Sequence, residues 1–522
     1  GDNWTNNTNW CSDKPLSEWY GITYSDGHVN SIKLSYNNLS GELANELNDL
    51  TALTYLNLTE NNIISINIDN HPSLLELECY YSKTQTIKIN NCEKLEKLIC
   101  FYNSITELEI DNAYQLSELQ CQHNQLQELD LTSCPKLDYL VTYYNPNLTK
   151  IYISPYQEFY YSKKDDHTEF DINLDLLHKS TDFSKDGEVK QLQAATEGNG
   201  IDIVLMGDAY SDRMIADGTY ESVMKTAMEN FFTEEPYKSF RNYFNVYMVT
   251  AVSTIDVYGF QTDDDTTAFS CWFSSGTQVG GNDTKVFAYA QKALSNERMN
   301  EAIIIVMMRS KNNGGTCYMY YPDNNNADYG NGVSISYFPI GRNEERLSQV
   351  LHHEAGGHGF SKLADEYAYE YMGAVTSGYV SQIQTQQNNW GWFKNVDFTS
   401  DPTATRWSHF INDTRYVNEG LGAYEGGLTY WTGVWRPTEN SIMRDNTGGF
   451  NAPSREAIYY RIHKLAYGAN WEYNYEAFAQ WDAKNRKGAT ATRGVPYRTE
   501  MPEDFVPNHP PVIVNKSWKD AK

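Results

Sequence analysis

The chain has few basic residues and no long apolar run. Its 522 residues include 41 Lys and Arg against 68 Asp and Glu, which gives a formal net charge of −27. A phosphate backbone needs a basic surface, so this balance argues against nucleic-acid binding and against an anionic membrane surface. No apolar run is as long as about 18 residues, the length that a bilayer-spanning helix needs. We therefore expect no nucleic-acid partner and no transmembrane segment.

Cysteine is sparse and unevenly distributed. Six of the eight cysteines lie in the first third of the chain, and we interpret most of them as small buried hydrophobes. Hydrophobic residues make up 40% of the chain and aromatic residues 14%, a composition that excludes a disordered protein. At about 100–200 residues per domain, the length allows two to four domains.

The polar composition gives a hint about location. Asn, Asp, Tyr and Trp are abundant and Lys is scarce, which favours an extracytoplasmic protein that is secreted, periplasmic or on the cell surface. Lipid anchoring stays open. Two acidic stretches, 263–265 and 323–328, fit no complete calcium-binding loop, so we expect them to be solvated loops.

The first third of the chain is an internal repeat. A Leu-x-x-Leu pattern recurs with a fixed period of 21 residues, starting at Leu53, Leu74, Leu95, Leu116 and Leu137. A second apolar ladder has the same step, and an asparagine follows the first ladder at Asn61, Asn103, Asn124 and Asn145. This is the spacing of leucine-rich repeats, which stack to share one core. The pattern predicts an N-terminal leucine-rich-repeat solenoid with a cap over residues 1–160, in which the asparagines bond backbone at the turns.

The same ladder accounts for three thiols and predicts a surface. Cys79, Cys100 and Cys121 occupy ladder positions, so packing explains them better than metal or disulfide chemistry does. The alternate positions point outward and are mixed, acidic and aromatic: Tyr55, Asn57, Glu76, Glu78, Lys97, Ile99, Glu118, Gln120, Tyr139 and Val141. Either this face is solvated or docked on the next domain, or it binds a protein or glycan ligand.

After a charged, turn-rich boundary segment at 161–200, the pattern becomes that of an α/β domain. Apolar runs predict strands and periodicity predicts helices; the strands are 201–206, 244–252 and 302–308, and the helices are 214–232, 284–293 and 348–360. Residues 333–337 alternate like an exposed edge strand, which could pair with an extended substrate. The order of elements predicts a mixed sheet covered by helices within residues 201–522.

The chemistry is concentrated at residues 352–358, which read His-His-Glu-Ala-Gly-Gly-His. Two His beside a Glu on one helix is the arrangement of zinc hydrolases, in which the imidazoles bind the metal and the Glu activates water. The common spacing H-E-x-x-H places the two His on one helix face. Here His353 and His358 are five residues apart, which separates them by roughly 140° on a regular α-helix.

A local widening of the helix would solve this problem. A π-bulge adds one residue to a turn and is frequent at functional sites, and Gly356 and Gly357 tolerate the dihedral angles that it requires. We therefore predict that His353 and His358 bind Zn²⁺ and that Glu354 is the general base.

A third metal ligand is expected shortly after the second histidine. Asp365 and Glu366 follow His358 by seven and eight residues, and Gly359 could turn the chain back toward the metal. A carboxylate suits zinc as third ligand. We choose Asp365 and keep Glu366 as the alternative.

Three separated segments resemble the IgA-peptidase family of zinc metallopeptidases. They are residues 353–367 (His-Glu-Ala-Gly-Gly-His-Gly-Phe-Ser-Lys-Leu-Ala-Asp-Glu-Tyr), 207–210 (Gly-Asp-Ala-Tyr) and 436–444 (Arg-Pro-Thr-Glu-Asn-Ser-Ile-Met-Arg). The resemblance implies an α/β (α+β) zincin or metzincin-like catalytic domain with Met443 in the Met-turn beneath the zinc. Carried over to this chain, it implies the ligands His353, His358 and Asp365 and the base Glu354. The extra residue in H-E-x-x-x-H resembles the dipeptidyl-peptidase III pattern, in which a bulged helix still binds zinc.

Together these observations predict a secreted or surface zinc metalloendopeptidase acting on a protein or peptide substrate, with the repeats binding the substrate or a surface. The alternative is a non-catalytic surface binding or adhesion protein that retains a zincin scaffold. Glu354 favours the enzyme, because a purely structural zinc needs no base. An exopeptidase would instead release terminal residues. Tyr430, Arg436 and Arg444, near the Met-turn segment, are candidate oxyanion donors.

Overall fold

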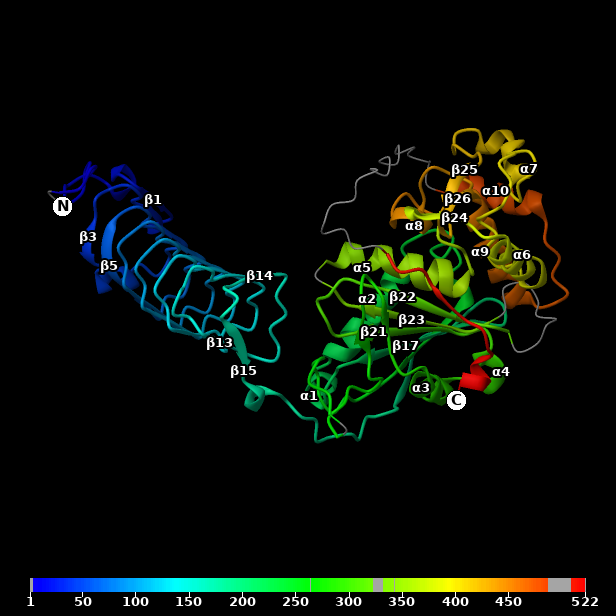
Figure 1. Ribbon diagram of the computed structural model, residues 1–522, viewed down its shortest axis with the longest axis horizontal. Coiled ribbons are helices and arrows are strands. Elements are labelled where there is room, and N and C mark those ends of the chain that lie inside the picture. The colour runs from blue at the N-terminus through cyan, green and yellow to red at the C-terminus, as the bar shows by residue number, and fades with distance from the viewer. Residues whose placement is uncertain (1–2, 263, 323–331, 342, 487–507, 522) are drawn as a thin grey trace. The chain divides into compact units, whose positions relative to one another are not determined.

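The computed structural model describes residues 3–262, 264–322, 332–341, 343–486 and 508–521. The chain forms two compact units, residues 1–177 and 178–522 (Figure 1), and each unit buries a hydrophobic core of its own. Residues 263 and 323–331, which include parts of both acidic stretches, lie outside the described residues. Within the described part of the chain, no helix has the length and apolarity that crossing a membrane requires.

Short strands spaced by the period of the sequence ladder build the first unit. Equivalent residues of successive repeats pair in parallel, as Leu56 does with Leu77 and Leu77 with Leu98. A β1–β2 hairpin begins this sheet. Among the described residues its strand order is β1 (Ile22–Ser25), β2 (His28–Lys33), β4 (Tyr55–Asn57), β6 (Glu76–Glu78), β8 (Lys97–Ile99), β10 (Glu118–Gln120), β12 (Tyr139–Val141) and β14 (Tyr161–Lys163).

The second ladder forms the opposite side of each repeat. Its parallel strands lie in two further sheets: β3 (Ser40–Glu42), β5 (Asn62–Asp69), β7 (Thr86–Asn90) and β9 (Glu107–Asp111) in one, and β11 (Glu128–Asp130), β13 (Lys150–Ile153) and β15 (Glu169–Ile172) in the other. Apolar side chains of both ladders pack into one core. Cys79, Cys100 and Cys121 are at most 1% exposed within it, so their interpretation as packing residues is confirmed.

The asparagines make the turn contacts that the spacing predicts. The Nδ2 group of Asn124 donates to the carbonyls of Cys100 and Cys121, both at 3.0 Å, and its Oδ1 accepts from the Ile105 amide at 3.0 Å. Asn145 bonds Cys121 in the same way one repeat later. Each side chain therefore satisfies backbone groups of two neighbouring repeats that would otherwise be buried without partners.

A mixed sheet organises the second unit. Its central strand β17 (Ile201–Asp208) is buried at every residue and pairs in parallel with both neighbours. In the described residues the strand order is β16 (Val189–Gln193), β18 (Phe244–Val249), β17, β21 (Ile303–Met308), β23 (Ser334–Pro339), β22 (Thr316–Tyr320) and β27 (Val512–Val514). Smaller sheets join β19 (Trp272–Phe273) to β20 (Val279–Gly280), and β24 (Ala368–Ala374) to β26 (Thr429–Arg436) and β25 (Tyr424–Gly427).

Helices cover both faces of the mixed sheet. Ile203 and Leu205 of β17 pack on the face where helix α2 lies, whereas Val204 and Met206 pack on the face of α3. The helices, as far as the described residues show them, are α1 (Asp212–Ala216), α2 (Thr219–Phe231), α3 (Asp283–Ala293), α4 (Asn296–Met299), α5 (Glu344–Leu351), the π-helix η5 (His352–Phe360), α6 (Ser377–Trp390), α7 (Ser408–Ile411), α8 (Ile442–Asp445), α9 (Ala452–Tyr467) and α10 (Tyr475–Asn485).

Two of the predicted elements need correction. The helix expected over 214–232 is divided in two, because Gly218 adopts a left-handed conformation (φ 85°) between α1 and α2. The predicted edge strand 333–337 is wrong. It falls in β23, which lies between β21 and β22 and is buried throughout, while the outer side of β22 is paired with β27.

The serines that suggested an exposed face have another reason. A Cβ atom at Gly359 of η5 would lie 3.0 Å from Ser334 Oγ and 3.4 Å from Ser336 Oγ. The alternation is therefore one of small and large side chains, which lets the helix pack closely on the sheet. Strand addition by a substrate at residues 333–337 is excluded.

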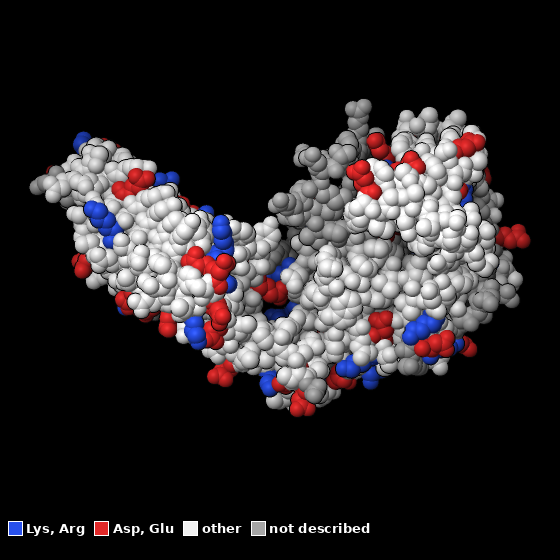
Figure 2. All heavy atoms as spheres, in the orientation of Figure 1, with Lys and Arg blue, Asp and Glu red and all other residues white. Residues whose placement is uncertain are grey.

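The surface charges are interspersed. On the face drawn in Figure 2, the Lys and Arg side chains of the described residues are scattered among Asp and Glu side chains, without a continuous basic strip. In the first unit Lys97 lies 3.5 Å from both Glu76 and Glu118 on neighbouring strands. Such solvent-accessible pairs contribute at most about 1 kcal/mol each.

Candidate metal centre

The helix that carries the histidine motif begins as a regular α-helix. Asn343 caps α5 by accepting a hydrogen bond from the Arg346 amide at 3.1 Å. From His352 onward the helix widens into the π-helix η5, where the Ser361 amide bonds the carbonyl of Gly356 five residues earlier. Residues five apart lie on nearly the same face of a π-helix. The predicted single bulge is thus a longer π-helical segment, and it brings the two motif histidines together.

The glycines of the motif are required by what packs against them. A Cβ atom at Gly357 would lie 2.3 Å from the sulfur of Met443, and one at Gly356 would lie 3.0 Å from the ring of Tyr237. The Tyr237 hydroxyl donates to the Gly356 carbonyl at 2.6 Å. A larger residue at position 357 would push the helix away from the Met443 segment, so this glycine sets the depth of the site.

His353, His358 and Asp365 converge on one point. The two Nε2 atoms are 3.0 Å apart, and each lies 3.1 Å from Oδ1 of Asp365. All three side chains are at least 95% buried. The three ligating atoms lie within 4.8 Å of one another, so one ion could contact all of them.

The tautomers of the histidines explain why an ion fits there. Nδ1 of His353 lies 2.8 Å from the carbonyl of Ile442, and Nδ1 of His358 lies 2.7 Å from that of Leu363. A carbonyl only accepts, so both Nδ1 atoms must be the donors, and each imidazole, once its Nε2 is deprotonated, turns an Nε2 lone pair toward the other. Two lone pairs and a carboxylate oxygen then meet in one buried place, which is a donor set for a divalent cation.

The charges in this cluster shift each other's ionisation. In the metal-free site, burial acts to lower the pKa of His353, but Asp365 and Glu354 outweigh it and raise that pKa to about 9, so a metal ion must displace a proton from this imidazole to use its Nε2 lone pair. Burial acts to raise the pKa of Asp365, but the two imidazoles lower it to about 2. Asp365 is therefore ionised at neutral pH, and the site attracts positive charge even though it is buried.

Glu354 lies beside this cluster on the same helix. Its Oε2 accepts a hydrogen bond from the Cys317 amide of β22 at 2.9 Å, which fixes the carboxylate. Burial raises its pKa above the usual range. Glu354 and His353 line a small cavity of about 20 Å³ that also touches Gly315 and Asn508. A fixed carboxylate with a raised pKa, next to a space that water could enter, suits a proton acceptor.

Glu366, the alternative third ligand, points away from the two histidines. Its carboxylate accepts hydrogen bonds from Ser441 (2.7 Å), Asn395 (2.9 Å) and Asn451 (2.8 Å), and its amide donates to the Met443 carbonyl at 2.7 Å. Both carboxylate oxygens are used in tying together three segments of the chain. Of the two candidates for the third ligand, only Asp365 faces the histidines.

The segment around Met443 packs against the π-helix that carries the histidines. Met443 is fully buried against Gly357, and the carbonyl of the preceding Ile442 holds the ring of His353. This is where the resemblance places a Met-turn.

The candidate oxyanion donors lie nearby, but two of them are engaged elsewhere. Arg436 donates to the carbonyls of Glu425 and Gly426 at 2.6 and 2.9 Å, and Arg444 donates to the Glu439 carbonyl. Tyr430 is partly buried, and its ring packs on that of Tyr379 with centroids 5.5 Å apart.

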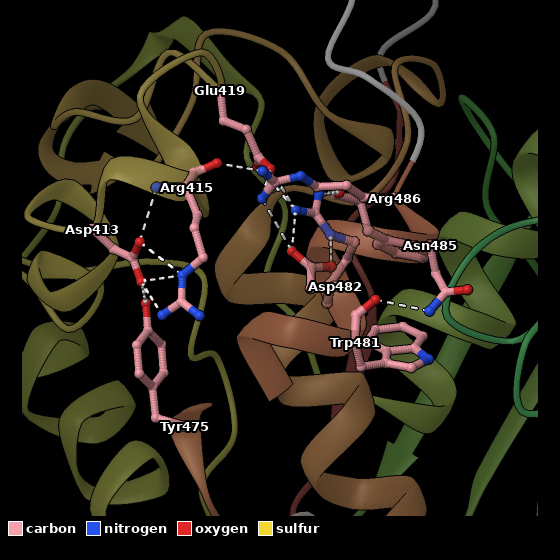
Figure 3. Close-up of polar contacts among 10 residues, drawn as sticks. Asp413, Arg415, Glu419, Tyr475, Trp481, Asp482, Asn485 and Arg486 are labelled. Carbon is pink, nitrogen blue, oxygen red and sulfur yellow. Dashed lines mark hydrogen bonds and ion pairs between the residues drawn. The ribbon is translucent and has the colours of Figure 1, made fainter. Parts of the chain in front are cut away.

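A larger cavity of about 780 Å³ adjoins the small one and shares Asn446 with it. Buried ion pairs fix one wall of it (Figure 3). Arg455 contacts Asp482 at 2.6 Å and Glu419 at 2.8 Å. Arg486, labelled in Figure 3, contacts Glu419 at 2.7 Å. The size lies within the usual range for ligand-binding pockets, so the space beside the candidate metal centre could hold part of a substrate.

Comparison with known proteins agrees with the chemistry of this site. Residues 189–419 match the family model described as IgA Peptidase M64, a range that contains the motif histidines and Asp365. No curated protein matches the chain. Among solved structures, the functional domain of InlJ from Listeria monocytogenes, described as including a cysteine ladder, is 21% identical over 26% of this chain and 39% of that chain. The TM-score of this match is 0.18.

The family match covers less than half of the chain, and all of it lies in the second unit. Residues 189–419, within the second unit, are therefore similar to the IgA peptidase M64 family, whose description is that of a peptidase.

Proposed function

We propose that the protein is a zinc metalloendopeptidase in which His353, His358 and Asp365 hold the metal and Glu354 is the general base. The observation that carries the proposal is the convergence of two Nε2 lone pairs and one ionised carboxylate oxygen at 3.0–3.1 Å. A Glu fixed beside these ligands on the same helix supports a hydrolytic role, since a structural metal needs no base.

A divalent ion held by these residues would act as a Lewis acid that polarises the scissile carbonyl and makes water more acidic. The chain's own residues do the remaining work. The Cys317 amide holds Oε2 of Glu354, which leaves Oε1 to take the proton of the attacking water and pass it to the leaving nitrogen. The raised pKa of Glu354 brings this carboxylate closer to the range in which it can both accept and return a proton.

We also propose roles for the two units of the chain and a location for the protein. We assign a leucine-rich-repeat solenoid to the first unit, which extends the expected range 1–160 by β14 and β15, and a metzincin-like α/β fold to the second unit, which extends the expected range 201–522 by β16. The repeats would bind the protein substrate or a surface through their outward strand residues. The composition supports an extracytoplasmic location, secreted, periplasmic or at the cell surface.

Peptide cleavage by the full chain tests the proposal. We expect zinc-loaded wild type to make internal cuts in a mixed peptide library, read by mass spectrometry, and a chelator to abolish them. Glu354→Gln should lower kcat by about 10²–10⁴-fold, the usual contribution of general acid–base catalysis, while zinc content stays at the wild-type level. Glu370→Gln, an exposed glutamate on β24, is the matched control and should cleave like wild type.

The same assay separates the other functions. Release of single terminal residues or dipeptides in place of internal cuts would indicate an exopeptidase. Equal product from wild type, chelated protein and Glu354→Gln would refute the enzyme and leave a binding protein that keeps a zincin scaffold.

A further inference from the structure

The large cavity of about 780 Å³ lies next to the candidate metal centre. His352, which precedes His353 in the chain, lines it, and so does Ile442, whose carbonyl bonds the His353 ring. The cavity also shares Asn446 with the small cavity that contains Glu354. A peptide whose scissile bond lay at the metal would therefore have neighbouring residues beside this space.

The basic side chains in the cavity wall are already neutralised. Among the described residues, those that line the cavity are Arg455 and Arg486. Both contact Glu419, at 2.8 and 2.7 Å, and both contact Asp482, at 2.6 and 3.4 Å. Figure 3 shows Arg486 between these two carboxylates. Two guanidinium groups and two carboxylates balance each other, so the network adds no net charge to the cavity.

Glutamates from three separate segments also line the cavity. Among them are Glu235 in the loop after α2, Glu344 and Glu345 in the first turn of α5, and Glu439 in the loop before α8. Glu235 accepts a hydrogen bond from the Ser239 amide and Glu345 one from the Gln349 side chain, and such neutral donors leave the charge in place. Within the described residues, none of these four glutamates forms an ion pair with Lys or Arg.

The position of these glutamates is only partly explained by the fold. A carboxylate in the first turn of a helix is stabilised by the helix dipole, which accounts for Glu344 and Glu345. Glu235 and Glu439 lie in loops and have no such reason to be there. The described lining of the cavity therefore has an excess of negative formal charge beside the metal centre.

A buried hydrogen-bond acceptor in the same wall also lacks a donor. Asn440 lines the cavity, and its Nδ2 group donates to Thr447 Oγ1 at 3.4 Å. Because Thr447 Oγ1 itself donates to Asp445, the orientation of the amide is fixed. Oδ1 of Asn440 is buried and accepts no hydrogen bond from any described residue. The wall thus offers an acceptor as well as negative charge to a ligand that carries N–H donors.

A divalent ion would be a poor occupant for these carboxylates. In the part of the chain that the structure describes, the ligand atoms close enough to hold one ion are those of His353, His358 and Asp365, and no glutamate of the cavity belongs to such a group. Carboxylates spread over several segments suit the long side chains of Lys and Arg, which carry several N–H donors at the end of a flexible stem.

We propose that the large cavity is a specificity subsite that binds a basic side chain of the substrate, so that the enzyme prefers peptide bonds close to Lys or Arg. This substrate class rests on the proposed peptidase function. The glutamates attract a basic segment, disfavour an acidic one and pair with the bound cation. They touch no reacting atom, so the preference should appear in KM and in binding, with little effect on kcat.

Peptides that differ in one side chain test the preference. An N-acetylated, C-amidated Ala-rich peptide carries Lys, Gln or Glu at one position, which is moved along the sequence, and mass spectrometry locates the cuts. With zinc-loaded wild type, kcat/KM should be highest for Lys and lowest for Glu, mainly through KM. Salt at 1 M should reduce this preference, because the Debye length is then only about 3 Å. Binding to metal-free full-length protein, followed by fluorescence anisotropy, should show the same order.

A triple variant, Glu344→Gln, Glu345→Gln and Glu439→Gln, tests the role of the cavity. All three side chains are exposed, and Gln keeps their shape. An exposed charge pair contributes a factor of about 1.4 to 5, so the preference for Lys over Gln should fall by about threefold to a hundredfold in binding and in kcat/KM. Zinc content and kcat for the Gln peptide should stay at wild-type values.

The matched control changes the same number of charges elsewhere in the second unit. Glu297, Glu370 and Glu472 are exposed and line neither cavity. Replacing all three by Gln alters the net charge of the protein by the same amount, so this control should keep the wild-type preference for Lys.

Four results would overturn the subsite. Binding and kcat/KM within about twofold for the Lys, Gln and Glu peptides show that the cavity does not select charge. An equal loss of preference in both triple variants shows an effect of the overall charge. A preference that requires a free N-terminus shows that an α-amino group is recognised. A second divalent ion per chain, lost in the first triple variant, shows a metal site.

Failure of the proposed peptidase function would look different. Wild type that binds zinc and prefers the Lys peptide in the anisotropy measurement, but cleaves none of the peptides, refutes the peptidase and leaves a cavity that binds basic peptides. Cleavage without any preference for Lys refutes the specificity subsite and leaves the peptidase.

Discussion

Adjacent carboxylates in the candidate centre have opposite environments. The Asp365 carboxylate lies beside the Nε2 atoms of His353 and His358, and these two imidazoles lower its pKa. Glu366 is surrounded by amide and hydroxyl donors, and burial raises its pKa. Asp365 is therefore placed to bind a cation, whereas Glu366 links three segments of the chain through hydrogen bonds.

The two positions should therefore respond differently to substitution. Asp365→Asn keeps the shape but removes the charge, so we expect zinc affinity to fall by at least about tenfold to a hundredfold. The metal-free protein should lose less stability than Glu366→Ala does, because His353 can release its proton when the carboxylate is gone. Glu366→Ala leaves three buried donors unpaired and should destabilise the metal-free protein by about 3–5 kcal/mol. Chelator-competition titration and thermal unfolding measure the two effects. Equal loss of stability in both variants would contradict the assignment.

Lys362, which follows the π-helix η5, is a further buried titratable residue. Its side chain is fully buried, its Nζ has no hydrogen-bond partner among the described residues, and the Trp392 ring lies 5.6 Å away. Burial, reinforced by Arg461, lowers its pKa to about 7. The unfolded chain binds this proton below about pH 10.4, whereas the folded protein binds it only below about pH 7.

Lys362→Met should stabilise the protein in a pH-dependent way. Because the folded pKa is depressed, the penalty is absent above about pH 10.4, grows as the pH falls, and is constant below about pH 7. The gain in unfolding free energy should be about 3 kcal/mol larger at pH 7 than at pH 9.5. Denaturant titrations of both proteins at the two pH values check this. An equal gain at both values would mean that the ammonium is charged in the fold.

Sequence reasoning found the residues of this centre that are local. His353, His358, Glu354 and Asp365 lie within 13 consecutive residues, so their spacing carries the information. The partners of Glu366 are 29, 75 and 85 residues away. Nothing in one sequence brings such positions together, which is why the choice between the two carboxylates stayed open until the fold was known.

At the scale of elements, the contact between η5 and α8 sets the geometry of the centre. The side-chain hydrogen of Gly357 faces the Met443 sulfur, where a Cβ atom would come within 2.3 Å. At Gly356 the corresponding approach to Tyr237 is 3.0 Å. Position 357 is thus the tighter of the two.

Gly357→Ala should destabilise the protein by about 1–3 kcal/mol through overpacking and lower zinc affinity, because the helix must move away from α8. Gly356→Ala should cost less. Met443→Ala opens space at the contact, so the cost of Gly357→Ala should shrink in that background. A double-mutant cycle followed by thermal unfolding measures this coupling, and additive effects would show that the two residues do not set the depth of the site.

The elements that the sequence predicted well are those with a strong period. The repeat strands and the helix over 348–360 follow from ladders and turns of fixed spacing. The strand at 333–337 was placed on an edge because polar and apolar residues alternate there. That alternation reflects close packing of η5 on Ser334 and Ser336, and a period of two cannot distinguish a small buried residue from an exposed polar one.

At the scale of the whole molecule, the two units have separate cores, and within the residues that the structure describes the candidate metal centre lies in the second unit. A ligand stabilises only the unit that binds it, by about 4 kcal/mol at a thousandfold excess over Kd. Calorimetry of the full chain should therefore show two transitions, and zinc removal should lower the midpoint of only one. Equal shifts in both, or a single transition that zinc moves as a whole, would contradict independent units.

The central claim is that His353, His358 and Asp365 bind one metal ion. Metal analysis of the full chain by mass spectrometry after zinc loading and desalting tests it most directly, with wild type, Glu354→Gln, His358→Ala and Asp365→Asn side by side. We predict one zinc per chain in wild type and in Glu354→Gln, and little or none in the two ligand variants. The claim is contradicted if wild type retains no metal, or if all four proteins retain the same amount.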